Sequence, residues 1–303
     1  MDLILYGLPE SLPAERELLA SDLAITLGSS SAIVAHNLAA LGCKVGFSSC
    51  IGRDDFGEMA LSRLKSIGVD VSTVVRLPPP AKTGLTVILP RAGWRNILTH
   101  PGTISELRQE HLNFDFLSSA RHFHVSSYFL QTGLQPYVPE LLKRLKAKGL
   151  TISLDTNDDP ADKWSYGVDK VLSLVDVFLP NEREAKKITG TSTLSDALAR
   201  LAEVVPLIVV KLGQEGALAR RGKETLRAPA VPTECVDSVG AGDSFDAGFL
   251  SSYVRGADIE ECLESGNVAG ALSVTRQGGT EAFRDAEHRD RFFAEHSAAD
   301  SKT

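Results

Sequence analysis

Short apolar runs alternate with amphipathic helical patterns, and this alternation limits the folds open to the chain more than any other feature. The runs have the length and β-branched content of buried strands, and they lie at residues 45–50, 123–127, 151–154, 175–179 and 207–212. Apolar residues at helical spacing predict helices over residues 32–41, 56–67, 137–148, 182–188 and 194–204. Because parallel strands need crossover helices and are buried on both faces, we expect an α/β fold with a mostly parallel central sheet.

Two stretches interrupt this alternation and contain short strand-like pieces and turn residues without a helix. Strands without crossover helices are typical of antiparallel hairpins. We therefore expect a small β-sheet lid formed by residues 1–28 and 71–100. The lid would stand over an α/β body formed by residues 29–70 and 101–303, and a cleft between such parts is a common ligand site.

The charge balance and the cysteines restrict partners and location. With 32 basic and 39 acidic residues, the net charge of −7 disfavours a nucleic-acid partner. No apolar stretch reaches the ~18 residues of a transmembrane helix, and no basic region marks a signal peptide, so we expect no membrane partner. The four cysteines form no CxxC pair, which indicates free thiols and a cytoplasmic location.

The segment DSVGAGDSFDAG at residues 237–248 carries the strongest chemical signal. Gly240, Ala241 and Gly242 precede a helical pattern, and a helix N-terminus with free N–H groups is suited to phosphate. Asp243 lies in the first helical turn, where Asp is favoured for helix initiation alone. Alternatively, Asp243 accepts the proton of a hydroxyl that attacks a phosphoryl group held by these N–H groups.

This segment resembles the C-terminal signature of the PfkB/ribokinase family of carbohydrate kinases. Further motifs follow the family's order over nearly the whole chain, namely residues 28–70, PNEREA at 180–185, VVKLGQEGA at 209–217 and SVTRQGG at 273–279. The resemblance implies a ribokinase-like fold and an ATP-dependent kinase that transfers the γ-phosphate to a hydroxyl of a small carbohydrate. It also implies that Asp243 is the general base and that the turn 240–242 is the anion hole.

The resemblance implies further ligand sites. Mg²⁺ would lie near Asn181 and near Glu184, the latter acting through water, as suits a cation that keeps its waters. The nucleotide would contact a set of residues that comprises Asn181, Glu184, Lys211, Gly213, Gly216, Asn267 and Gly279. A monovalent cation such as K⁺ would lie at a site formed by Asp237 with the backbone near Ser273, Arg276 and Gly278.

On the acceptor side, Asp2 matches the family's acidic residue that binds sugar hydroxyls. Gly28 and Ser29 match a Gly–Gly pair, and Ile33 stands where the family usually has asparagine. The changes at Ser29 and Ile33 alter shape and hydrogen bonding at the sugar. They leave the identity of the substrate open.

Residues 154–164 resemble a variant of the family's DxNxR segment without its arginine. Asp155 and Asn157 would face the cleft at the end of a strand, or else serve only to form a turn. Arg95 in the lid is the candidate replacement for the missing arginine. The resemblance also implies a further core strand ahead of Asp2, so numbering from an internal methionine, or an absent first strand, is expected.

Two alternative functions remain open on the sequence. A nucleoside kinase of the same family would be favoured if Ile33, Tyr128 and Phe129 form a less polar acceptor site. A non-catalytic sugar or nucleotide sensor is the other alternative, against which the GAGD segment argues. A dehydrogenase is disfavoured because no GxGxxG fingerprint follows an early strand. An exposed lid edge predicts a homodimer formed through the lid.

Overall fold

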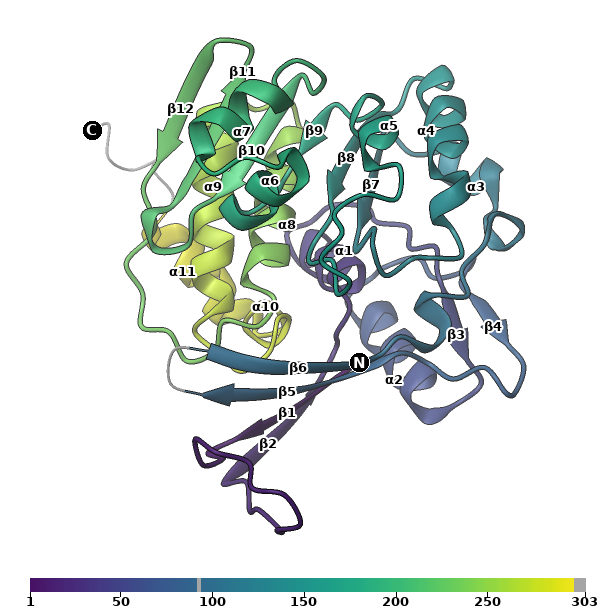
Figure 1. Cartoon of the computed structure of the whole chain (residues 1–303), viewed down its shortest axis with the longest axis vertical. Coiled ribbons are helices and arrows are strands. Elements are labelled where there is room, and N and C mark those ends of the chain that lie inside the picture. Colours follow the sequence, from purple (N-terminus) through teal and green to yellow (C-terminus); the bar gives the residue numbers. More distant parts are fainter. Residues whose placement is uncertain (92–93, 297–303) are drawn as a thin grey trace.

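A six-stranded sheet forms the centre of the body in the computed structural model, which describes residues 1–91 and 94–296 (Figure 1). Its strand order is β12-β11-β10-β9-β8-β7. Four neighbouring strands are parallel, namely β7 (His122–Ser126), β8 (Thr151–Asp155), β9 (Val177–Phe178) and β10 (Leu207–Lys211). An antiparallel hairpin completes the edge, with strands β11 (Ala217–Arg221) and β12 (Glu224–Ala228). The expected mostly parallel sheet is confirmed, and the hairpin adds to it.

Helices cover both faces of this sheet because its strands are apolar on both sides. Ile208 and Val210 of β10 face one apolar cluster, and Leu207 and Val209 face another. The first cluster contains residues of α4, α5, α6 and α7, and the second contains residues of α8 and α9 (Figure 1). Successive strand residues point to opposite faces, so the continuous apolar runs of the sequence are explained.

The expected helices are present, with boundaries close to the predicted ones. The helices are α1 (Ser30–Ala40), α2 (Asp55–Ser66), α3 (Phe114–Ser118), α4 (Val138–Ala147), α5 (Val168–Leu172), α6 (Glu182–Thr189), α7 (Leu194–Leu201), α8 (Ala241–Tyr253), α9 (Ile259–Ser273), α10 (Glu281–Arg284) and α11 (Ala286–His296). Within the described ranges, none of them has the length and apolar character needed to cross a bilayer.

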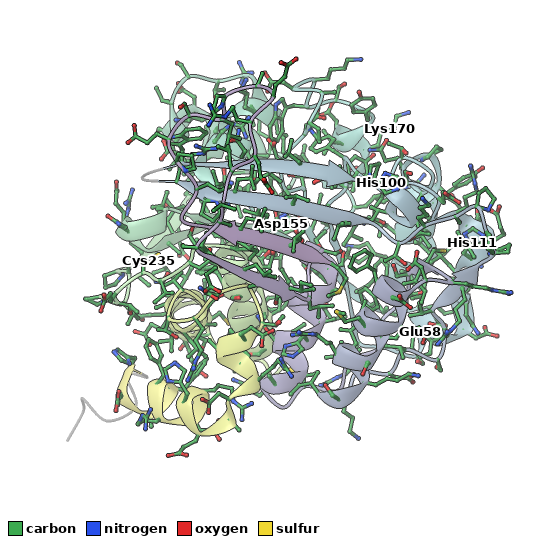
Figure 2. The ribbon with its side chains drawn as sticks, turned by 90° about the horizontal axis from the view of Figure 1, so that it is seen from below. Glu58, His100, His111, Asp155, Lys170 and Cys235 are labelled. Carbon is green, nitrogen blue, oxygen red and sulfur yellow. The ribbon has the colours of Figure 1, made fainter. Side chains whose placement is uncertain are left out.

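A separate four-stranded sheet lies against the body, in the order β2-β1-β5-β6 (Figure 1). It consists of β1 (Asp2–Tyr6), β2 (Asp22–Thr26), β5 (Leu85–Arg91) and β6 (Trp94–His100). Two antiparallel hairpins are joined by parallel pairing of β1 with β5, a pairing that the hairpin pattern did not predict. Ile4 and Ile88 are buried together with Val239 of the body. Figure 2, in which the molecule is seen from below, shows these strands lying across the body.

The segment around residues 45–50 and the start of the lid differ from expectation. Strand β3 covers only Cys50–Gly52, and it pairs in parallel with β4 (Val75–Leu77) to form a two-stranded sheet. Residues 75–77, which were expected in the lid, therefore pair with β3 instead, and the second hairpin of the four-stranded sheet begins at Leu85. Of the predicted strand 45–50, only Cys50 lies in β3. Residues 45–49 form an isolated parallel bridge between Gly46 and Asp70 and single bonds such as that of the Phe47 N–H to Asp70 O at 2.8 Å.

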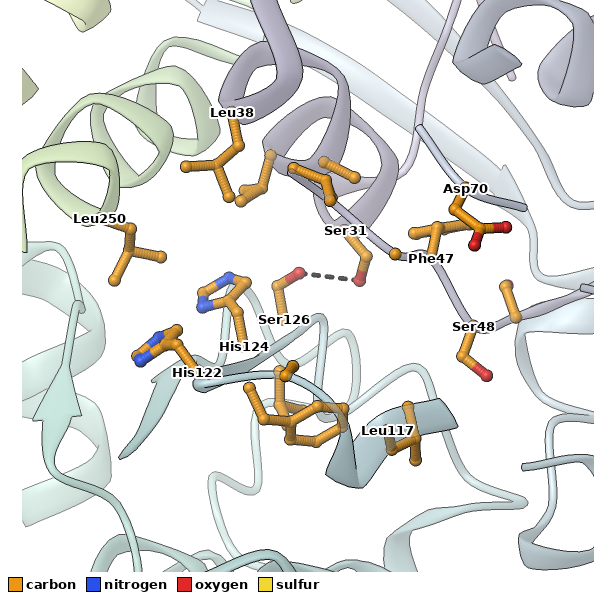
Figure 3. Close-up of a pocket in the computed structure, with 18 of the residues that line it drawn as sticks. Ser31, Leu38, Phe47, Ser48, Asp70, Leu117, His122, His124, Ser126 and Leu250 are labelled. Atoms are coloured by element: carbon orange, nitrogen blue, oxygen red, sulfur yellow. Dashed lines mark hydrogen bonds between the residues drawn. The ribbon is translucent and has the colours of Figure 1, made fainter. Parts of the chain in front are cut away.

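A cavity of about 1020 Å³ separates residues 41–49 from the edge strand β7 (Figure 3). Every residue from 41 to 49 and from 119 to 127 lines it. Because successive residues of a strand face opposite sides, a cavity in contact with all of them lies beside β7, in the plane of the sheet. This gap explains why residues 45–49 do not extend the six-stranded sheet.

Candidate active site

The ends of three parallel strands meet the first turn of α8 at one place in the body. Asp155 is the last residue of β8, Lys211 is the last residue of β10, and Asn181 follows β9 closely. Asn181 and Lys211 form an isolated parallel bridge. The carboxyl ends of parallel strands are the usual ligand-binding edge of an open α/β sheet, so the structure brings these predicted site residues together there.

The glycine turn at the start of α8 is packed backbone against backbone. Gly240, the N-cap residue of α8, has φ 73° and no side-chain cap. A Cβ on Gly240 would lie 2.5 Å from Cα of Gly279, so a larger residue would disrupt the turn. The Ala241 N–H donates to Ser238 O at 3.3 Å. The remaining first-turn N–H groups, including that of Gly242, are suited to bind an anion.

Asp243 lies directly after this turn and is only 8% exposed. Its Oδ1 is 3.4 Å from Nδ2 of Asn157. Burial raises the pKa of Asp243 to about 6, with a further increase from the negative charge of Asp155, while Lys211 acts in the opposite direction. A carboxylate with a pKa just below neutrality is a stronger base than an ordinary aspartate and is still mostly ionised at pH 7.

Asn157 is held in place on both sides. It adopts φ 53°, and its Oδ1 accepts the Ser127 N–H at 2.7 Å. Its Nδ2 donates to Oδ2 of Asp155 at 3.1 Å, and its own N–H donates to Oδ1 of Asp155 at 3.0 Å. Asn157 therefore both forms the turn after β8 and lies beside Asp243.

Lys211 binds two buried carboxylates. Its Nζ lies 2.8 Å from Oδ2 of Asp155 and 3.1 Å from Oδ1 of Asp246. Asp246 was absent from the predicted site residues. It follows Asp243 by three residues on α8, and this spacing places both on one helix face, which is the signal that could have identified it.

Asn181 and Glu184 form a capping box at the start of α6. Oδ1 of Asn181 accepts the Glu184 N–H at 2.9 Å, and Oε2 of Glu184 accepts the Asn181 N–H at 2.9 Å. Glu184 is 5% exposed. Burial raises its pKa to about 7, and Asp155 contributes in the same direction. The PNExEA motif thus has a local helix-capping role beside any ligand role.

Three of the predicted nucleotide residues, Gly213, Gly216 and Asn267, lie next to the strand hairpin β11–β12, whereas Gly279 packs against Gly240. Gly213 and Gly216 bracket a short 3₁₀ turn after β10, and both have positive φ. A Cβ on Gly216 would lie 2.2 Å from Ala228 O. Asn267 donates through Nδ2 to the carbonyls of Ala228, at 3.1 Å, and Pro229, at 2.9 Å. The Asn267 amide therefore anchors the segment that follows β12.

The lid meets the body at Asp2, which is buried. A Cβ on Gly28 would lie 2.0 Å from Oδ1 of Asp2, so only glycine leaves room for this carboxylate. Burial raises the pKa of Asp2 to about 6, and the charge of Asp237 raises it further, whereas Arg95 and the chain's own amino group lower it. Nη1 of Arg95 donates to Oγ of Ser238 at 3.0 Å, which links β6 to the body.

The two departures from the family pattern lie at the start of α1. Ser29, the N-cap residue, has φ 71° and ψ 121° and makes no side-chain cap. Ile33 is buried. A Cβ on Gly279 would lie 2.9 Å from Cδ1 of Ile33, and a Cβ on Gly240 would lie 3.3 Å from the same atom. Ile33 therefore packs against the glycine turns.

Asp237 binds three donors within the chain. It accepts the hydroxyl of Tyr6 at 2.8 Å, the Gly278 N–H at 2.9 Å and the Val239 N–H at 3.0 Å. Oγ of Ser273 is buried and has no hydrogen-bond partner among the described residues. The Arg276 side chain instead binds Asp285. This oxygen-rich corner joins the lid, through Tyr6, to the segment that precedes the glycine turn.

Solved structures place this fold in a known class. The candidate ribokinase II of E. coli, in complex with ATP and Mg²⁺, superposes with a TM-score of 0.83, 27% identity, and coverage of 97% of this chain and 96% of that one. A ribokinase from Thermotoga maritima superposes with a TM-score of 0.80 and 25% identity, covering 97% of this chain and 96% of that one. The chain therefore has a ribokinase-like α/β fold with a small β-sheet lid.

The sequence comparisons give the family. A model of pfkB family carbohydrate kinases matches residues 4–286. Cytidine kinase of Thermococcus kodakarensis is 34% identical over 79% of this chain and 84% of its own length. The 2-dehydro-3-deoxygluconokinase of Bacillus subtilis is 30% identical over 81% of this chain and 79% of its own length. This chain belongs to the pfkB family of carbohydrate kinases, as its motifs predicted.

Proposed function

We propose that the protein transfers the γ-phosphate of ATP to a hydroxyl group of a small carbohydrate. The observation that carries this proposal is the position of Asp243, a buried carboxylate that directly follows an uncapped glycine turn at a helix N-terminus. A base and an anion site are thereby adjacent, as phosphoryl transfer to an alcohol requires.

In this proposal Asp243 accepts the proton of the acceptor hydroxyl while the hydroxyl oxygen attacks the γ-phosphorus. The bond between the γ-phosphorus and the bridging oxygen breaks, and ADP leaves with that oxygen. The backbone of residues 240–242 stabilises the charge on the transferring phosphoryl group. The sugar phosphate and ADP leave the site, and Asp243 returns its proton to solvent.

Cations have candidate positions near the phosphates. Glu184 and Asn181 supply carboxylate and amide oxygens, which fit Mg²⁺ bound through water, and bound Mg²⁺ would neutralise phosphate charge. Gly213, Gly216 and Gly279 would border the nucleotide, with Asn267 supporting them through its bonds to the β12 segment. A K⁺ site would use the oxygens of Asp237 and nearby backbone carbonyls, including those near Ser273, Arg276 and Gly278.

The acceptor would bind between the body and the lid, which we assign to residues 1–28 and 71–100 apart from the β4 segment. Asp2 would accept hydrogen bonds from sugar hydroxyls, beside Gly28 and Ser29. Asn157 would orient the hydroxyl at Asp243, with Asp155 behind it. Arg95 would add a positive charge at the lid, and lid closure would exclude water as a competing acceptor.

A nucleoside acceptor is the second candidate, because one relative at 34% identity is a cytidine kinase. Tyr128 and Phe129, which were expected to form a less polar acceptor site, do not support a nucleoside acceptor. Both side chains are buried and pack edge to face against each other, and the Tyr128 hydroxyl donates to Tyr166 O at 2.7 Å. We therefore favour a carbohydrate acceptor.

We also propose that two copies associate through the outer face of the lid. Ile25, Leu3, Val87 and Leu98 lie in one cross-strand row of that sheet, and Ile25 and Leu98 are 40% and 57% exposed. Apolar rows of this kind mark interaction surfaces.

A cytoplasmic location is proposed from the four cysteines, all of which are free thiols, because thiols stay reduced in the cytoplasm.

The test is ADP release from Mg²⁺–ATP with free sugars, sugar acids, sugar phosphates and nucleosides as acceptors. We expect turnover with a carbohydrate, and Asp243→Asn should lower kcat at least ~10²-fold while ATP binding persists. Asp169→Asn is the matched control, because Asp169 is an exposed first-turn aspartate of α5, and its turnover should equal that of the wild type. Asp243→Asn turnover within a few-fold of wild type would exclude the base role. A folded, ATP-binding protein without any turnover would indicate a sensor.

A further inference from the structure

Lys211 carries a charge that is buried inside the body. Its side chain is 12% exposed, and its two carboxylate partners, Asp155 and Asp246, are 1% and 0% exposed. Nζ of Lys211 lies 2.8 Å from Asp155 and 3.1 Å from Asp246. A buried cation bound by two acidic side chains is held in one geometry, because leaving a buried charge unpaired is costly.

A continuous chain of polar contacts leads from this ammonium group to Asp243. Oδ2 of Asp155 accepts hydrogen bonds from Lys211 and, at 3.1 Å, from Nδ2 of Asn157. The same Nδ2 lies 3.4 Å from Oδ1 of Asp243. Oδ1 of Asn157 is fixed by the Ser127 N–H at 2.7 Å. The side-chain amide that faces Asp243 is therefore oriented from both of its ends.

The ammonium group also lies next to the first turn of α8. A Cβ on Gly242 would be 3.7 Å from Nζ of Lys211, and Asp246 lies on the same helix as Asp243. In this buried setting a positive charge favours the ionised form of a nearby carboxyl group. Among the groups that act on the pKa of Asp243, burial and Asp155 raise it, and Lys211 lowers it.

We infer that Lys211 is a positioning residue for proton transfer: by binding Asp155 and Asp246, it fixes Asn157 against Asp243 and holds a positive charge beside the first turn of α8. This inference rests on the proposed function, in which Asp243 takes the proton of the acceptor. It assigns Lys211 to the base side of the site, in place of the nucleotide contact that its motif implied.

The experiment measures kcat/KM against pH for the wild type, Lys211→Met and Lys211→Arg. Loss of the positive charge should move the acidic limb of the Lys211→Met profile upward by about 1 pH unit or more. Lys211→Arg retains the charge and should keep the limb within a few tenths of a unit of the wild-type position. Lys187→Met, at an exposed lysine paired with Asp162 on the surface, is the control and should show no displacement.

An unshifted limb in folded Lys211→Met would overturn the inference, as would a large rise in KM for ATP with kcat unchanged. If circular dichroism shows Lys211→Met to be unfolded, Asp155→Asn gives the same test with the opposite sign. Removing the Asp155 charge should move the limb to lower pH, and a limb that stays or rises would refute the inference. Asp243→Asn with near wild-type turnover would instead refute the proposed function itself.

Discussion

Ser29 holds a backbone conformation that suits glycine, and replacing it by glycine should stabilise the protein. The backbone of Ser29, at φ 71° and ψ 121°, is strained because its Cβ clashes with the neighbouring backbone in this conformation. The side chain is exposed and caps nothing, so its removal loses no contact. The backbone carbonyl of Ser29 accepts the Ala32 and Ile33 N–H groups, each at 2.9 Å, and Ser29→Gly preserves both bonds.

The size of the effect follows from two opposing contributions. Relief of a sparsely populated backbone conformation contributes about 1–3 kcal/mol to the free energy of unfolding. The greater freedom of glycine in the unfolded chain costs about 0.5–1 kcal/mol. The expected net gain is about 1 kcal/mol, which corresponds to about a fivefold change in the folding equilibrium constant.

Urea unfolding followed by circular dichroism measures this gain. With a slope of about 3 kcal/mol/M for a chain of this size, the midpoint should rise by about 0.3 M at an unchanged slope. Ser29→Ala is the matched control, because it removes the hydroxyl but keeps the strained Cβ, and its midpoint should equal that of the wild type. An unchanged or lower midpoint for Ser29→Gly would show that the conformation is not strained.

Two further predictions concern the lid. Tyr6→Phe removes the hydroxyl that donates to the Asp237 carboxylate at 2.8 Å, and a hydrogen bond to a charged group contributes about 1.5–3 kcal/mol. Urea midpoints should therefore fall, with Tyr137→Phe, at an exposed tyrosine, unchanged; equal midpoints would show that this bond does not stabilise the lid. Leu98→Asp places a charge in the outer row of the lid and should convert a dimer into a monomer in light scattering, whereas a dimer that persists would exclude this interface.

The local patterns of the chain were sufficient for most elements of the body. Helices and buried strands were predictable because period 3.6 and continuous apolar runs are properties of short segments. The expected position of Asp155 at a strand end followed from the same patterns, as did the glycine turn before Asp243. These local signals, taken in order along the chain, were also sufficient to indicate the family.

Pairings between distant segments could not be predicted in the same way. Strand β1 pairs in parallel with β5, and β3 pairs in parallel with β4. These pairings depend on the path of the chain between the strands, which no local sequence pattern encodes. The same limit applies to the predicted strand 45–50, because residues 45–49 line the cavity beside β7 instead of pairing with that strand.

The site shows the same division between sequence and tertiary structure. Sequence alone identified the residue types for phosphoryl transfer, because the glycine turn and Asp243 are adjacent in the chain. Only the folded structure showed that Ile33 packs against Gly240 and Gly279 and that Lys211 binds Asp155 and Asp246. The partners of a buried charge are chosen by the geometry of converging strands and helices, since burial makes each charge require its partner, and that geometry exists only after the chain has folded.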